Sequence, residues 1–277
     1  MVALITGNFD DSLSDGDVWT VSGYVGYANQ WSFFEELWTA ALTKHGVPYF
    51  HMKEMNDPDG PFAKWLPHKD HQPEVIAFFT DLVGVIQRTG LRMISSGVWL
   101  PDLARFNAEN GLALEEYPLA AYACMGQTVQ QYGELPAMLM FDRVDKVDDK
   151  LQKARVYAES DQRGGFFDQI TTVPLEKSVT ARDVPAMQAA DLIAWEARKA
   201  LVGMKTWQSA SDKPQTNRKA QWKHYVDFTR ETTGSDPILR KSLENLIVGM
   251  PTYNVVWDRQ QIDYVHKLRN RIWSKAA

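Results

Sequence analysis

Asp191 is an acidic residue in an otherwise apolar stretch, PAMQAADLIAW at residues 185–195. A helix with this sequence would be apolar on nearly every side, and such a helix is normally buried. A carboxylate is rarely buried unless something pairs with it. Asp191 therefore needs a partner, and the sequence leaves three kinds open: a basic side chain such as Arg182 or Arg198, a helix end, or a metal ion.

Two more acids stand at the ends of apolar, β-prone runs. Asp10 closes the first run, and Asp142 closes the run PAMLMFD. In an open α/β sheet, functional residues collect at the carboxyl ends of strands, so these acids are candidates to meet Asp191. Asp10 also has a structural interpretation as a turn residue, and Asp142 as a helix cap.

Three carboxylates that meet repel one another unless a cation neutralises them or some stay protonated. Ligands that are all oxygen favour Mg²⁺ or Mn²⁺. Two such ions side by side can hold the attacking and leaving oxygens of a phosphodiester displacement. The acids thus point to metal-dependent phosphodiester chemistry.

Four residues near these acids are further candidates. Asp11 follows Asp10, but neighbouring strand residues point to opposite faces, so both acids are not expected in one site. His51 and Glu54, in FHMKEM, would share a helix face, and either could be a ligand or a general base. Gln188 lies three residues before Asp191, where it could orient the carboxylate or contact substrate.

The pattern of elements predicts an α/β domain with a mixed sheet. Two β-prone runs separated by Ser-Asp-Gly predict an antiparallel hairpin. Amphipathic and apolar segments then alternate with further β-prone runs. The expected helices are 30–46, 73–90, 116–133, 149–160 and 185–203, and the expected later strands are 91–100, 136–142 and 166–178.

Length and composition predict one large domain with an appendage. The chain has 277 residues and 44% hydrophobic content, enough for a substantial core. Beyond residue 204 it becomes polar with scattered Trp, so we expect a domain at 1–204 and a helical C-terminal extension at 205–277 packed on it. No apolar run reaches the roughly 18 residues of a membrane span. Cys124, the single cysteine, fits a buried position and a reducing cytoplasm.

The net charge of −5 argues against a dedicated nucleic-acid coat protein. Basic residues gather late in the chain, however, and Arg198, Lys199 and Lys219 could supply local patches for a polyanion. The alternative is ordinary solvated surface.

In order, these motifs resemble the family called domain of unknown function 3800. FDDS resembles the Asp-Glu-Ser motif that closes its first strand, FHMKEM its short His-containing motif, and MLMFD its strand ending in Asp. MQAADLIAW resembles its Gln-x-Ala-Asp helix and is the most specific match. The resemblance covers roughly residues 3–200.

This resemblance implies a ribonuclease H-like fold with a mixed five-stranded sheet flanked by helices. It also implies that Asp10, Asp142 and Asp191 bind two divalent metals, with Glu54 or His51 as a possible fourth member. Gln188 and Asp11 would support the site. The sequence departs from the family pattern at Asp11, where Glu is usual, and at Leu13, where Gly often occurs.

Three functions follow, in decreasing order of preference. The first is a metal-dependent nuclease acting on nucleic acid by two-metal hydrolysis, with Asp10, Glu54, Asp142 and Asp191 as its catalytic residues. The second is an inactive scaffold that binds nucleic acid or protein, because fold does not fix function. The third is an aspartyl phosphatase, which normally needs Asp-x-Asp rather than adjacent acids.

Overall fold

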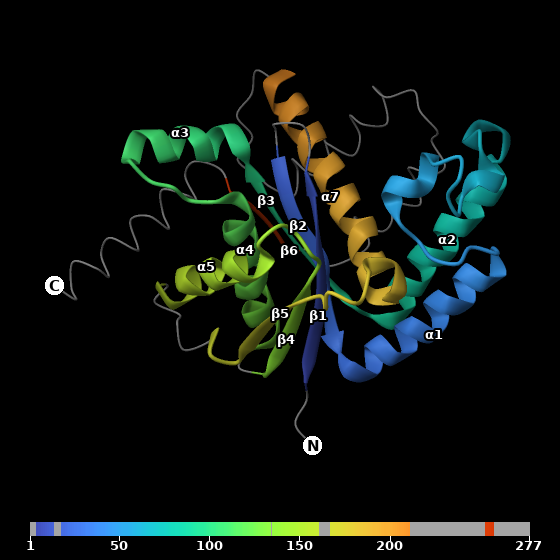
Figure 1. Cartoon of the computed structure of the whole chain (residues 1–277), viewed down its shortest axis with the longest axis horizontal. Coiled ribbons are helices and arrows are strands. Elements are labelled where there is room, and N and C mark those ends of the chain that lie inside the picture. Colours follow the sequence, from blue (N-terminus) through green and yellow to red (C-terminus); the bar gives the residue numbers. More distant parts are fainter. Residues whose placement is uncertain (1–3, 14–17, 134, 161–166, 211–252, 258–277) are drawn as a thin grey trace.

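A computed structural model describes residues 4–13, 18–133, 135–160, 167–210 and 253–257. Within these ranges the chain forms a central sheet with helices on both faces (Figure 1). The first face carries α1, α2 and α7, and the second carries α4 and α5.

The sheet is mixed, with strand order β5-β4-β1-β2-β3-β6. β1 pairs antiparallel with β2, and β2 pairs antiparallel with β3. β4 runs parallel to β1 and to β5, and β6 runs parallel to β3. The predicted α/β class, a mixed sheet of five strands flanked by helices, is confirmed in β1 to β5, and β6 is an additional edge strand. The strands are Ile5–Leu13 (β1), Val18–Tyr27 (β2), Arg92–Trp99 (β3), Ala137–Phe141 (β4), Ile170–Pro174 (β5) and Tyr253–Trp257 (β6).

Helices lie between β2 and β3, β3 and β4, and β4 and β5, and also follow β5. Their apolar residues recur at the spacing that the sequence indicated. In α1, for example, Trp31, Phe34 and Trp38 all face the core. Gly90, with φ of 66°, ends α2, because a left-handed backbone suits glycine. The α-helices are Ala28–Lys44 (α1), Gln72–Thr89 (α2), Leu100–Asn110 (α3), Glu116–Tyr132 (α4), Val147–Ser160 (α5) and Pro185–Ala210 (α7); the short 3-10 helices are Met52–Asn56 (η1), Ala63–Trp65 (η2), His68–Asp70 (η3) and Ala181–Asp183 (η4).

Each face of the sheet packs its own apolar core. Residues of α4 and α5 pack on alternate strand residues such as Phe9 and Phe141, whose rings stack with centroids 5.0 Å apart. Residues of α1, α2 and α7 pack on the other face, around Tyr24 and Met93. Cys124 is fully buried in the first of these cores, as predicted.

The C-terminal region differs in part from its prediction. The expected boundary at residue 204 falls inside α7, which continues to Ala210. Most of the predicted helical extension at 205–277 lies outside the described residues, but Tyr253–Trp257 form a strand rather than a helix. They extend the sheet beside β3. Helix α3 is a second difference, since no helix was predicted directly after β3.

No helix in the described ranges is both long enough and apolar enough to span a bilayer.

Candidate functional site: a carboxylate cluster at the ends of β1 and β4

Asp10 and Asp142 lie side by side on neighbouring parallel strands. Phe9 pairs with Phe141 in the β1–β4 register, and the Asp142 N–H donates to the Phe9 carbonyl at 2.8 Å, so the ladder continues by one residue. Phe9 and Phe141 face α4 and α5, and side chains alternate along a strand. Asp10 and Asp142 therefore both face the layer that contains α7.

Asp191 comes to this pair from α7, which packs on β1 and β2. Its neighbours Leu192 and Ile193 are fully buried, whereas Asp191 keeps some exposure. Its Oδ2 accepts a hydrogen bond from the Met52 N–H at 2.6 Å. This backbone donor, in the 3-10 helix η1, is a partner that the sequence did not suggest.

The three acids are close enough to perturb one another. Burial, and then the charges of Asp191, Asp142 and Asp11, raise the pKa of Asp10 well above its usual value. Burial also raises the pKa of Asp191, against the lowering effects of the Met52 N–H and the His51 charge. The structure thus brings together the three acids that the sequence singled out.

Asp11 faces the opposite side of the sheet from Asp10, as the alternation predicted. It lies near Tyr117 of α4, whose pKa is raised by burial and then by the charge of Asp11. The pKa of Asp11 itself rises to about 6, because burial and the Asp142 charge outweigh the attraction of Lys150 and Lys53. Asp11 therefore stands at the rim of the cluster, on the reverse face.

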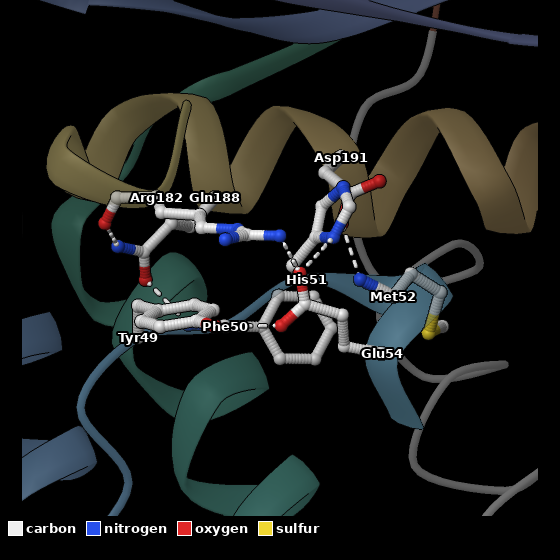
Figure 2. Close-up of polar contacts among 8 residues, drawn as sticks. All are labelled: Tyr49, Phe50, His51, Met52, Glu54, Arg182, Gln188 and Asp191. Atoms are coloured by element: carbon white, nitrogen blue, oxygen red, sulfur yellow. Dashed lines mark hydrogen bonds and ion pairs between the residues drawn. The ribbon is translucent and has the colours of Figure 1, made fainter. Parts of the chain in front are cut away.

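Glu54 lies in a hydrogen-bond network below Asp191 (Figure 2). Its Oε1 pairs with His51 Nδ1 at 3.1 Å and with the Arg182 guanidinium, and its Oε2 accepts from the Tyr49 hydroxyl at 2.7 Å. The Arg182 guanidinium also lies over the Tyr49 ring. With these three partners, Glu54 has neutralising contacts of a kind that the described residues do not give Asp10.

Gln188 holds three segments together and is 3% exposed. Its Oε1 accepts from Trp38 Nε1 and from the Phe50 N–H, both at 2.9 Å, and its Nε2 donates to the Arg182 carbonyl at 2.6 Å. Gln188 can therefore orient Asp191 only indirectly, because it fixes the segment whose Met52 N–H binds Asp191.

The donor set of the cluster suits a hard cation, because it consists of carboxylate oxygens. One oxygen of Asp191 is bound to Met52, and Asp10 Oδ1 accepts from the Asp11 N–H at 2.7 Å. The other oxygen of each would be the atom to take an ion. In the described part of the chain, however, no group of three His, Cys, Asp or Glu side chains is already arranged to hold a metal. The three acids are of the type that binds such a metal, and they lie on one side of the sheet. Their carboxylates would have to turn toward one another to hold it.

The basic residues chosen from the sequence occupy different settings. Arg198 Nε donates to Ser12 Oγ at 3.0 Å, and its guanidinium lies 4.3 Å from the Trp195 ring centroid. Lys199 pairs with Glu196 at 2.9 Å, and Lys219 lies outside the described residues. Two other basic residues, Lys53 and Lys150, act on the charges of this site, because both lower the pKa of Asp11. The sequence did not single them out.

Comparisons with known proteins add little to this geometry. No protein-family model matches the chain, so membership of the domain of unknown function 3800 family stays a prediction. No curated protein matches either. One similar solved structure is Bst-RNase HIII in complex with Mn²⁺, at 12% identity and a TM-score of 0.37, covering 90% of this chain and 70% of that one. At this TM-score the two structures overlap loosely, and the fold assignment rests on the strand order and directions given above.

Proposed function

We propose that this protein is a metal-dependent phosphodiester hydrolase, a nuclease acting on nucleic acid in the cytoplasm. One observation carries the proposal: Asp10 and Asp142 share a sheet face, and Asp191 approaches them from α7, so that Asp142 and Asp191 raise the cost of ionising Asp10. Buried carboxylates that repel one another are expected where a cation is meant to bind.

Asp10, Asp142 and Asp191 would hold Mg²⁺ or Mn²⁺, which would supply an activated water and stabilise the leaving oxygen of the phosphodiester. Asp191 is held for this task by the Met52 N–H. The charge of His51 lowers the pKa of Asp191, and Glu54 pairs with His51 at 3.1 Å. The saturated contacts of Glu54 favour a positioning role over direct ligation.

The alternative is a scaffold that binds nucleic acid or protein without catalysis. Its support is that no group of three potential ligand side chains among the described residues is preformed around an ion. In that case the acids would belong to a structural polar network, and divalent ions would not change the stability of the protein.

Cleavage of labelled single-stranded and duplex DNA and RNA, with Mn²⁺, Mg²⁺ or EDTA, tests the proposal. We expect cleavage that needs the ion and is lost in Asp142→Asn. Cleavage that persists in EDTA, or that survives in Asp142→Asn, would contradict it.

A further inference from the structure

Lys150 lies on α5, on the side of the sheet that Asp11 faces. Its Nζ is 5.5 Å from the ring centroids of both Trp19 and Tyr117, and those two rings make an edge-to-face pair with centroids 6.4 Å apart. The Lys150 charge also acts on Asp11, whose pKa it lowers. The two aromatic rings thus hold an ammonium group at the carboxyl end of β1.

Lys53 reaches the same cluster from η1, on the side of α7. It directly follows Met52, whose N–H binds Asp191 at 2.6 Å, and its side chain is exposed. Its charge lowers the pKa of both Asp11 and Asp191. Lys53 therefore lies next to the segment that binds Asp191, and its side chain is open to solvent.

Arg198 lies beyond the cluster along α7. It follows Asp191 by seven residues, which is two helical turns, so both lie on one helix face about 10 Å apart. Its Nε donates to Ser12 Oγ, and Ser12 lies two residues after Asp10 on the same face of β1. Arg198 thus marks the far end of the row of acids.

Three different elements, η1, α5 and α7, thus bring a basic side chain close to the acids at the end of β1. Cations gathered around one site attract a polyanion to it.

We propose that Lys53, Lys150 and Arg198 form a phosphate-binding rim that holds the sugar–phosphate backbone of a nucleic acid across the carboxylate cluster. This inference rests on the proposed function and names the side chains that would bind its substrate. It also explains how a chain of net charge −5 could bind a polyanion, through cations placed around the site.

The salt dependence of binding tests the rim. We would measure binding by the fluorescence anisotropy of labelled mixed-sequence oligonucleotides in Mn²⁺, before cleavage has proceeded. The probes are single-stranded DNA, single-stranded RNA and duplex DNA. Each phosphate contact contributes about 0.7 (single strands) to 0.9 (duplex) to the slope of log K against log salt. We expect Lys53→Gln, Lys150→Gln and Arg198→Gln each to weaken binding and lower the slope by about this amount.

Two controls separate charge from folding. Lys153→Gln, one turn further along α5 where Lys153 pairs with Glu115, is expected to leave the slope unchanged. Arg198→Lys, which keeps the charge, is expected to retain most of the slope. Unchanged slopes in all three Gln variants, or a wild type that binds none of the probes, would overturn the rim.

The rim and the proposed function fail in different ways. If Mn²⁺-dependent cleavage occurs but no Gln variant changes the slope, the nuclease stands and the rim is wrong. If the slopes fall as expected but no ion supports cleavage, the rim stands and the protein is a nucleic-acid-binding scaffold.

Discussion

Two buried acids of this protein, Glu54 and Asp10, are held in opposite ways. Glu54 is surrounded by donors from Tyr49, His51 and Arg182. Asp10 accepts a hydrogen bond from the Asp11 N–H, and its pKa is raised by burial and by the charges of Asp191, Asp142 and Asp11. A carboxylate with its hydrogen bonds made stabilises the fold, whereas one held against like charges is costly unless a cation arrives.

The same residue type therefore serves two purposes within one site. The Glu54 network and Gln188 fix η1 and the start of α7, and η1 supplies the N–H that holds Asp191. The carboxylate cluster is the part that this framework positions. Variants in the two regions should therefore differ in effect. Those in the framework should lose stability, and those in the cluster should lose activity.

The largest effect is expected on activity in the cluster. Asp142→Asn keeps the shape of the side chain but removes a negative charge from the metal site, which we expect to lower kcat/KM by roughly a thousandfold or more, several kcal/mol of transition-state stabilisation. Single-turnover cleavage in Mn²⁺ measures it. The paired chemical-unfolding measurement should show little loss of stability, and a variant that unfolds easily would place Asp142 in the framework instead.

The largest effect on stability is expected at Gln188. Gln188→Leu leaves Trp38 Nε1 and the Phe50 N–H buried without an acceptor, so we expect a loss of about 3–5 kcal/mol in the free energy of unfolding. Urea denaturation measures the loss.

Gln127→Leu is the matched control for that change. Gln127 is 4% exposed, but it makes one hydrogen bond, to the Ser95 carbonyl at 3.2 Å, and its Oε1 has no partner. We expect a loss of about 1 kcal/mol or less. Equal losses in the two Leu variants would show that burial alone, not the network, sets the cost.

The pH dependence of stability should show the strain in the cluster. The pKa of Asp11 rises from 3.8 to about 6 on folding, so the folded state binds its proton more tightly than the unfolded state. Its contribution is present below about pH 4 and is lost as the pH rises through 6. Relative to Asp11→Asn, the wild type should therefore lose about 1–2 kcal/mol between these values, which is less than the full shift implies because Asp11 is partly exposed.

Urea denaturation of both proteins at several pH values checks this difference. A difference that stays constant between pH 4 and 6 would mean that Asp11 ionises as freely in the folded protein as in the unfolded chain.

The smallest effect is expected from single hydroxyl groups. Tyr49→Phe removes one hydrogen bond to Glu54 and should cost about 0.5–1.5 kcal/mol. Tyr24→Phe removes a buried hydroxyl that has no partner, so it should be neutral or slightly stabilising. Thermal unfolding compares the two variants. A larger loss of stability in Tyr24→Phe than in Tyr49→Phe would contradict the idea that hydrogen-bonded hydroxyls stabilise the fold more than unpartnered ones.

Much of the cluster could be predicted from local patterns. Asp10 and Asp142 close β-prone runs, and a parallel pairing of those runs brings them to one face. Asp191 stood out because its neighbours are apolar. The mixed sheet followed from the order of the elements, and the ends of α1 and α2 were predicted to within about two residues.

The framework could not be predicted in the same way, because its partners are distant in sequence. Gln188 bonds to Trp38 and Phe50, and no periodicity links those positions. The partner of Asp191 is a backbone N–H, which carries no sequence signal at all. Strand β6 was hidden because the polar residues around it favoured a helical interpretation, although YNVVW is itself β-prone.

Thermal unfolding with and without Mn²⁺ tests the central claim most directly, since it needs no knowledge of the substrate. An ion at 100 times its dissociation constant should stabilise the wild type by about 2.7 kcal/mol. Asn at 142 or 191 keeps an oxygen acceptor but loses the charge, so Asp142→Asn and Asp191→Asn should fold without responding to the ion. No Mn²⁺ response in the wild type, together with variants that unfold easily, would mean that the acids are structural and that the metal-dependent nuclease is wrong.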